Sequence, residues 1–371
     1  MWFNTGITRT APERRAFRLP MPSPARPIHL AFLGCGFITA VHSRVLRRFA
    51  RTDVTYSYAS RDRAKAEAYR ARYGGQTAFG DYASAIADPG VDAVVIAVPP
   101  NQHLELALAA FAAGKHVFVE KPAFATMADY MTVRAARDRA GRVAIVGEND
   151  HYKPLAVTLR RLLAEGAIGD MVFAHFTTIT HRLKRADDWR NDEAIACGDA
   201  FFEEGIHWLH VAGSLGPRIT SIRGFRPSIS REGPDRRAKS MMVAFRYDNG
   251  AVGALYYSRE IPSFFKGLRL SKLFGRRGVI TFESNGVFLI ARGGALPRVI
   301  FPGFRDIRGY GAMYRDFLAA IREGRAPEMS LERAIEDQAL MDQVYATIAA
   351  DAGGGSTPEV PRAAQAGTHG L

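Results

Sequence analysis

Two short motifs, each directly after an apolar run, most strongly constrain what this chain can fold into. GCGFIT (residues 34–39) follows the run at 28–33, and EKP (residues 120–122) follows the run HVFV. A glycine-rich turn between a buried strand and a helix is typical of dinucleotide-binding units. Ligands of open parallel sheets bind at the carboxyl ends of the strands. The two motifs therefore predict one cofactor pocket with a lysine beside it, and hence redox chemistry.

Residues 28–150 alternate between β-branched apolar runs and helix-like segments. Strands are expected at residues 28–33, 53–59, 92–100, 116–120 and 143–146, and helices at 37–49, 62–73, 81–87, 102–113 and 127–140. Apolar runs joined by helices predict a parallel sheet covered on both faces. We therefore expect the α/β class, with an N-terminal Rossmann domain, a doubly wound parallel sheet, at residues 28–150.

The pattern changes after residue 150. Helices are expected at 154–165, 199–212, 311–322 and 331–349, and strands at 171–180, 239–247, 251–258, 269–274, 278–283 and 287–290. The residues Asp248, Asn249 and Gly250 lie between two strand-like runs, which is a hairpin signal. Closely spaced strands of this kind predict an α+β domain with a large, mostly antiparallel, open sheet at residues 151–350.

Both ends of the chain differ in composition from the rest. Residues 1–27 carry five arginines and five prolines without periodicity, and they lack the apolar core of a secretory signal. An Arg-rich transit peptide is the alternative, but the prolines oppose its helix. We expect a disordered extension, with Met21 as an alternative start. Residues 351–371 are expected to form a disordered tail.

Composition and charge bear on location and partners. No run approaches the ~20 apolar residues of a membrane helix, so no membrane partner is expected. Only two cysteines are present, one of them inside the glycine-rich turn, which predicts no disulfide and a reducing, cytoplasmic location. The net charge is +13, but no Lys/Arg run exceeds two residues and no basic stripe alternates with aromatics. We therefore expect no nucleic-acid partner.

The glycine-rich turn supplies the first candidate cofactor residues. Gly34 permits the tight turn, and Gly36 lets the backbone approach a pyrophosphate on the helix that begins with Phe37 and Ile38. Thr39 replaces the third glycine of the usual fingerprint. An ordinary glycine turn is the alternative.

The end of the second strand bears on the choice between NAD and NADP. An Asp or Glu there holds the ribose 2′-hydroxyl in NAD-preferring proteins, and Ala59 has no such group. Ser60 and Arg61 could instead hold a 2′-phosphate, which favours NADP. The alternative is that Arg61 is a solvated residue at a helix start.

Lys121 is the candidate for proton transfer. Beside the positive nicotinamide ring its pKa would fall, and its amine could exchange a proton with a substrate hydroxyl. A surface salt bridge between Lys121 and Glu120 is the alternative.

Four stretches give the chain a resemblance to a known family. They are GCGFITAVH (34–42), SRDRAKAEAYRARYG (60–74), DPGVDAVVIAVPPNQHLELALAAFAAGKHVFVEKP (88–122) and NDHYKP (149–154). In them the chain resembles the glucose–fructose oxidoreductase, inositol dehydrogenase and MocA (Gfo/Idh/MocA) family. The resemblance implies that Glu120 and Lys121 lie beside the nicotinamide and that the lysine assists catalysis.

The resemblance also implies further site residues. Pro99, Asn101 and His103 are expected along the cofactor cleft, although His103 is alternatively a polar residue at a helix N-terminus. Asn149 and Tyr152 of the NDHYKP stretch are expected to contact substrate.

The third motif of the family is altered here. The corresponding stretch is CGDAFFEEGIHWLH at 197–210. The usual form of the motif is GGG, then any three residues, then Asp, any residue, Gly, any residue and His. Glu203 stands in place of the Asp, His207 matches the His, and His210 stands where many members have another Asp. In the family, the Asp and His positions shuttle the proton of the reacting hydroxyl.

The spacing of this motif adds an argument from geometry. Glu203 and His207 are four residues apart on a predicted helix and share one face, so the carboxylate could raise the pKa of the His and orient it. A helix-surface ion pair is the alternative. The change from Asp to Glu lengthens this side chain by one methylene relative to the usual residue of the family.

The loop before that helix is expected to border the substrate. We expect contacts from Trp189 and Arg190, with solvent exposure as the alternative. His207 and His210 alone make a weak ligand set, so no metal is expected.

The resemblance implies an NAD(P)-dependent oxidoreductase that moves hydride between nicotinamide and a secondary alcohol or ketone of a sugar, sugar derivative or cyclitol. A redox-type glycoside-cleaving enzyme and a cofactor-binding regulatory protein without turnover are the alternatives. It also implies a homodimer or homotetramer through the C-terminal sheet, with apolar residues in 241–245 and 252–257 at the interface.

Overall fold

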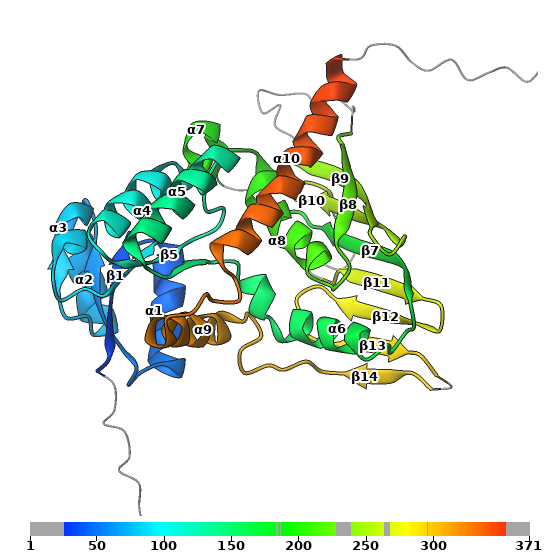
Figure 1. The fold of residues 1–371 in the computed structure, drawn as a ribbon, viewed down its shortest axis with the longest axis horizontal. Coiled ribbons are helices and arrows are strands. Elements are labelled where there is room, and N and C mark those ends of the chain that lie inside the picture. The colour runs from blue at the N-terminus through cyan, green and yellow to red at the C-terminus, as the bar shows by residue number, and fades with distance from the viewer. Residues whose placement is uncertain are drawn as a thin grey trace, which may run out of the picture.

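The protein has two sheets side by side, linked by helices (Figure 1). The computed structural model describes residues 26–182, 185, 187–227, 239–262, 268–294 and 296–353. Nearly all of the predicted N-terminal extension and most of the predicted tail lie outside these residues. Arg26 already belongs to the fold, because its guanidinium pairs with Asp92 at 2.6 Å.

The first sheet is parallel throughout, with the order β3-β2-β1-β4-β5-β6. Its strands are β1 (Ile28–Leu33), β2 (Val54–Ala59), β3 (Ala78–Phe79), β4 (Ala93–Ile96), β5 (His116–Val119) and β6 (Ala144–Val146). This is the order of a dinucleotide-binding Rossmann sheet, whose crevice lies where the order reverses between β1 and β4. The predicted Rossmann fold, with its parallel sheet, is confirmed. β3 was not predicted, and the strand expected at 92–100 ends at Ile96, before two prolines.

Helices cover both faces of this sheet. They are α1 (Phe37–Phe49), α2 (Arg63–Tyr73), α3 (Tyr82–Ala87), α4 (His103–Ala112) and α5 (Met127–Ala140). Asp62 and Thr126 accept backbone N–H bonds at the starts of α2 and α5, and Gly74 and Gly141 end these helices in the left-handed conformation. Such caps satisfy the backbone groups at the helix ends, so the capping residues fix where each helix begins and ends.

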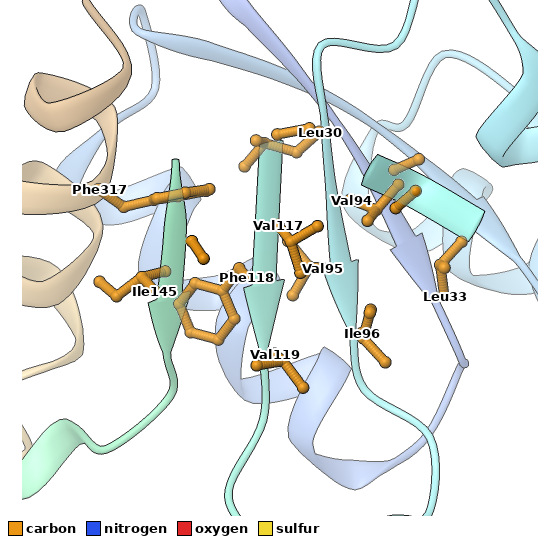
Figure 2. Close-up of a cluster of buried hydrophobic side chains, with 14 of the residues drawn as sticks. Leu30, Leu33, Val94, Val95, Ile96, Val117, Phe118, Val119, Ile145 and Phe317 are labelled. Atoms are coloured by element: carbon orange, nitrogen blue, oxygen red, sulfur yellow. The ribbon is translucent and has the colours of Figure 1, made fainter. Parts of the chain in front are cut away.

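The core of the Rossmann domain is completed by the C-terminal part of the chain. Figure 2 shows Phe317 close to Ile145 and Phe118, at the side of the cluster where β6 lies. The rings of Phe118 and Phe317 lie 5.8 Å apart, edge to face. Phe317 belongs to α9 (Tyr310–Glu323), which packs on α1. Residues far along the sequence are therefore needed to complete the burial of one face of this sheet.

The second sheet is mostly antiparallel, in the order β14-β13-β12-β11-β7-β10-β9-β8. Its strands are β7 (Met171–Ile179), β8 (Ile219–Phe225), β9 (Ser240–Tyr247), β10 (Val252–Ser258), β11 (Leu270–Gly275), β12 (Gly278–Glu283), β13 (Leu289–Arg292) and β14 (Arg298–Ile300). Only the β7–β10 pair is parallel among these described strands. The predicted α+β sheet is confirmed, although β8 and β14 were not predicted.

Three helices of the second half cover one face of this sheet, α6 (Pro154–Ala164), α8 (Ala200–Gly213) and α10 (Leu331–Gly353). The short helix α7 (Glu193–Ala196) lies beside the Rossmann helices in Figure 1. α10 contacts α5 and β6 of the Rossmann domain and also α8 and β8, and it crosses between the two sheets in Figure 1. It continues to Gly353, beyond residue 349, where the sequence placed its end.

The other face of the second sheet is open and partly apolar. Phe173, Tyr256, Phe274, Ile290 and Val299 are exposed on it. The sequence had placed the residues of 241–245 at this surface. That assignment is partly wrong, because Met241, Val243 and Phe245 face the core.

Among the described residues, no helix is both long and apolar enough to cross a membrane. The two cysteines of the chain, Cys35 and Cys197, are both free thiols.

Candidate active site

The glycine-rich turn lies between β1 and α1, at the carboxyl edge of the Rossmann sheet. Gly34 has a φ of +106°, and a Cβ there would lie 2.6 Å from the carbonyl oxygen of Ala97 on the neighbouring segment. Gly36 differs, because a Cβ at this position would meet nothing within 4 Å. Thr39, at the place of the third glycine, is buried and donates to the carbonyl of Gly34 at 2.7 Å. Its hydroxyl therefore adds a hydrogen bond across the turn, which a glycine at this position could not form.

The start of α1 fits a dinucleotide. Gly36 is its N-cap and offers no side-chain acceptor, so the first backbone N–H groups are open to a ligand. Ile38 is half-buried, while the Phe37 side chain is 74% exposed and stands beside the turn. Open backbone N–H groups at a helix start are the chemistry that a pyrophosphate needs.

The end of β2 carries the residues expected to distinguish the two cofactors. Ser60 is buried and accepts the N–H of Asp62, while Arg61 is exposed. The Asp62 carboxylate is engaged with the first N–H groups of α2. No free carboxylate therefore follows the strand directly.

Glu120 is held in place by a histidine that the sequence did not single out. His42 of α1 is fully buried, and its Nε2 lies 2.7 Å from Glu120 Oε1. Glu120 does not form the surface salt bridge to Lys121 that was the alternative, because it is itself buried. The motif GCGFITAVH contains His42. No local pattern in the sequence could have paired this residue with Glu120, which directly follows β5.

Lys121 reaches across to the second domain. Its Nζ donates to the backbone carbonyl of Glu203 on α8 at 3.0 Å, and the peptide bond to Pro122 is cis. Its ammonium group thus lies at the junction of the Rossmann sheet and α8.

Pro99 and Asn101 lie in the connection after β4, and His103 is the first residue of α4. Pro99 is half-buried and Asn101 is exposed, but His103 is buried with both ring nitrogens against backbone carbonyls. Nε2 lies 2.9 Å from Val98 O, and Nδ1 lies 3.0 Å from Ala123 O. His103 therefore ties the β4 loop to the segment after Lys121, as a positioning residue rather than an open cofactor contact.

His207 has a carboxylate partner from the other domain. Its Nδ1 lies 2.7 Å from Glu148 Oε1 and 3.9 Å from Asp150 Oδ1. Both carboxylates follow β6, and Glu148 is buried. No partner of His207 Nε2 is found among the described residues, so this nitrogen is available for a substrate hydroxyl.

Glu203 is not the group that orients His207, and that prediction is wrong. Its Oε1 accepts from Arg190 Nε at 2.7 Å, and its Oε2 accepts from Arg259 at 3.1 Å. The two arginines neutralise the buried carboxylate from both sides. The backbone of Glu203, through its carbonyl, is what contacts Lys121.

Asn149 and Tyr152 are both buried in a 3₁₀ turn, η2 (Asn149–Tyr152). The Asn149 side chain donates to Arg308 O at 2.8 Å. The Tyr152 hydroxyl donates to Asp316 at 2.7 Å and accepts the N–H of Met329. The structure therefore gives Tyr152 a role in joining η2 to α9.

Trp189 and Arg190 lie at the edge of the site. The Arg190 guanidinium stacks over the Trp189 ring, with its Cζ 4.3 Å from the ring centroid, and it also pairs with Asp188. Both side chains are half-buried, so neither is simply solvated.

A group of three residues has the geometry of a possible cation site, against the expectation of no metal ligands. Glu148, Asp150 and His207 each bring one donor atom within 4.8 Å of the others. However, Lys153 Nζ lies 2.6 Å from Asp150 Oδ1. This ammonium group neutralises the carboxylate that a cation would need, so we assign the group to proton chemistry.

Comparison with known proteins identifies the family. Residues 28–148 match the model of the oxidoreductase family with an NAD-binding Rossmann fold, and residues 156–281 match the Gfo/Idh/MocA C-terminal domain. Inositol 2-dehydrogenase 1 of Saccharopolyspora erythraea is 34% identical over 282 residues, which is 75% of this chain and 80% of that protein. The chain belongs to the Gfo/Idh/MocA family.

Other members of the Gfo/Idh/MocA family are also similar. Levoglucosan dehydrogenase of Pseudarthrobacter phenanthrenivorans is 27% identical over 67% of this chain and 68% of that protein. A 1-carboxy-3-chloro-3,4-dihydroxycyclohexa-1,5-diene dehydrogenase of Comamonas testosteroni is 29% identical over 51% of this chain, which spans about half, 48%, of that relative.

Solved structures share the fold. Levoglucosan dehydrogenase in complex with NADH and levoglucosan has a TM-score of 0.78 at 22% identity, over 88% of this chain and 98% of that one. The predicted family, fold class and NAD-binding oxidoreductase function are confirmed. The chain has an NAD(P)-binding Rossmann fold.

Proposed function

We propose that the protein oxidises a secondary alcohol of a sugar, sugar derivative or cyclitol, or reduces the corresponding ketone, with NADP or NAD. The observation that supports this most is the convergence of Lys121 with the His207–Glu148 pair, because it brings proton-transfer groups to the cofactor edge of a Rossmann sheet. The relatives named inositol 2-dehydrogenase and levoglucosan dehydrogenase suggest the substrate class.

The cofactor would be held by the turn at Gly34 and Gly36, the start of α1 and the end of β2. When bound, its nicotinamide supplies a hydride acceptor or donor. We propose a preference for NADP, since Arg61 is exposed after β2 and the Asp62 carboxylate is engaged in capping α2. A guanidinium group suits a 2′-phosphate, to which it donates two parallel hydrogen bonds.

The proton of the reacting hydroxyl would pass to His207 or Lys121. His207 is oriented through Nδ1 by Glu148, which leaves Nε2 to accept. Lys121 is held by the Glu203 carbonyl, and this carbonyl can keep a neutral amine in place after the proton has left. Trp189 and Arg190, at the border of the site, and Asn149, through η2, would shape the substrate pocket.

The exposed apolar residues of the open sheet face favour a homodimer or homotetramer through that face. Light scattering measures this directly. A monomer at micromolar concentration would contradict it.

The decisive experiment is titration of the protein with NADH and NADPH, followed by fluorescence. A panel of sugars and cyclitols is then assayed at the nicotinamide absorbance. Tight binding of NADPH and reduction of NADP⁺ by a panel member are expected. Cleavage of a glycoside without net reduced cofactor would instead show redox-type hydrolysis, and binding without any product would show a regulatory protein.

A further inference from the structure

A line of buried titratable groups runs from the second domain to the surface. His210 of α8 is 1% exposed, and its Nδ1 lies 2.8 Å from Asp337 Oδ2 on α10. Its Nε2 lies 3.0 Å from Nδ1 of His151, a buried residue of η2. His151 Nε2 lies 3.3 Å from Glu328 Oε2, and the Glu328 side chain is 65% exposed. Four side chains thus form an unbroken series of contacts that ends in water.

The inner end of this series meets the active site. Lys121, Glu148 and Asp337 line the same small cavity between the two domains. Its volume of about 10 Å³ is on the scale that holds a single water molecule. Glu148 Oε2 is buried and has no hydrogen-bond partner within the described part of the chain, while Oε1 holds His207. An unpartnered carboxylate oxygen beside such a cavity is placed to pass a proton through one water to a second carboxylate.

We propose that Glu148, Asp337, His210, His151 and Glu328 form a proton relay between the active site and the protein surface. This inference rests on the proposed function and deepens it. Alcohol oxidation releases one proton at a place that cofactor and substrate would cover, so that proton needs a path through the protein. His210, which departs from the usual family pattern, gains a role as the central relay residue.

The electrostatics of the relay agree with this role. Burial lowers the pKa of His151 to about 2, with help from the charge of His210, so His151 is neutral at rest. Burial also opposes charge on His210, but the Asp337 carboxylate outweighs it and raises the pKa of this imidazole. Burial raises the pKa of Asp337 despite His210, so the pair readily shares one proton.

Two arginines also face these groups. Arg160 donates to the backbone carbonyl of His151 at 2.7 Å, and the charge of Arg333 acts on His151, His210 and Asp337. Both disfavour a resting proton on His151. A charge that moves through His151 therefore does not stay there.

The proton balance is simple. The hydroxyl proton moves to His207 or Lys121, the C–H hydride moves to the nicotinamide, and a ketone forms. One proton enters the relay at Glu148 and one leaves at Glu328. Each carboxylate and imidazole between them releases one proton for each proton that it receives and so keeps its starting charge, and no further reactant is needed.

The first test uses the full chain with its preferred oxidised cofactor and with myo-inositol and levoglucosan as the alcohols. Stopped-flow absorbance follows hydride transfer, and a pH-indicator dye in weak buffer follows proton release. In the wild type, the two signals should rise together. In His210→Gln, hydride transfer in the first turnover should persist while proton release lags by about tenfold or more, since an amide can donate a hydrogen bond to Asp337 but neither takes up nor releases a proton near neutral pH.

The matched control is His29→Gln. His29, on β1, is also buried, and both of its ring nitrogens are bonded to hydroxyl groups of β2, those of Thr55 and Ser57. This variant should release its proton together with hydride transfer. Simultaneous signals in a folded His210→Gln protein, or the same lag in His29→Gln, would overturn the relay.

A second measurement needs no turnover. In protein with ¹⁵N-labelled histidine, a coupling between the two nitrogens across the His151–His210 hydrogen bond should be detected by NMR. Its absence in the folded wild type would overturn the relay even if an alcohol is oxidised. If the coupling is present but neither alcohol reduces the cofactor, the failure lies with the proposed substrate class, and the relay is supported.

Discussion

His207 Nδ1 lies 2.7 Å from Glu148 Oε1, although the two residues are 59 positions apart in the chain. Glu148 follows the last Rossmann strand, and His207 lies on α8 of the second domain. The candidate base and its orienting carboxylate therefore come from different domains. Because their contact forms only when the two domains are docked, proton transfer by His207 depends on that docking.

Replacing Glu148 should alter the pH dependence of stability. Burial would raise the pKa of this carboxyl, but the charges of His207, His210 and Lys121 outweigh it and lower the pKa below 4.5. Such a group stabilises the fold above its unfolded pKa, and this stabilisation is lost as the pH falls toward the folded value. Urea unfolding at a series of pH values below about 4.5 should therefore show a shallower loss in Glu148→Gln than in the wild type. Equal slopes would contradict the pairing, and Glu165→Gln on the surface is the control.

Lys121→Ala should lower kcat by about 10²- to 10⁴-fold, the range for loss of a general acid or base. Cofactor affinity should stay nearly unchanged, because the phosphate groups would be held by the turn after β1. Steady-state kinetics and a fluorescence titration give the two quantities separately. Lys272→Ala, on the outer face of the second sheet, should leave both unchanged, and unaltered turnover in Lys121→Ala would exclude its catalytic role.

The two glycines of the turn should respond differently to the same substitution. Gly36→Ala should change the free energy of unfolding by less than about 1 kcal/mol, since the new methyl group meets nothing in the protein. It should nevertheless weaken cofactor binding, because the methyl group points into the expected pyrophosphate site. Gly34→Ala should cost about 1–3 kcal/mol of stability, since its φ is +106°. Normal cofactor affinity in Gly36→Ala would show that the pyrophosphate does not approach this residue.

Arg61→Ala should raise the Kd for NADPH by about 10- to 100-fold, as expected for the loss of hydrogen bonds to a charged group. The Kd for NADH should change little, because NADH lacks the 2′-phosphate. Isothermal titration calorimetry measures both. Arg63→Ala, two residues further on at the start of α2, is the control. A parallel loss of both affinities would show that Arg61 acts on the fold instead.

Arg259→Met should destabilise the protein by about 3–5 kcal/mol, because it leaves the Glu203 carboxylate buried with part of its charge uncompensated. Adding Glu203→Gln should restore much of this loss. Urea denaturation of the two variants measures both effects. Arg218→Met breaks an exposed ion pair with Asp248 and should cost at most about 1 kcal/mol. No recovery in the double variant would mean that Arg259 stabilises through packing alone.

The fold could be predicted from the sequence because its signals are local. The order of strands and helices in residues 28–150 follows from apolar runs, caps and glycines within a few residues of each other. Gly34, Gly36 and Lys121 were found in the same way, since each lies at the end of a strand-like run. β3 and β14, with two and three residues, are too short to show an alternating pattern.

The contacts inside the site were less predictable. Helical spacing correctly placed Glu203 and His207 on one helix, but it could not show that two arginines bind the carboxylate. His42 and Glu148 bind their partners across domains or strands, at separations for which no periodicity exists. One signal in the sequence could have indicated these partners. It is the cluster of acidic and histidine residues in NDHYKP (149–154) and in Glu148 directly before it.

Phe317 and Tyr314 lie in the core of the Rossmann domain, yet they are encoded near the end of the chain. A ribosome therefore releases all six Rossmann strands before the residues that fill one face of their sheet exist. Until α9 has been synthesised, α1 covers this face without the rings of Tyr314 and Phe317, and an incompletely covered apolar surface is prone to aggregate or to recruit chaperones. The order of synthesis thus makes the nucleotide-binding half, although first in the sequence, a late-maturing part of the molecule.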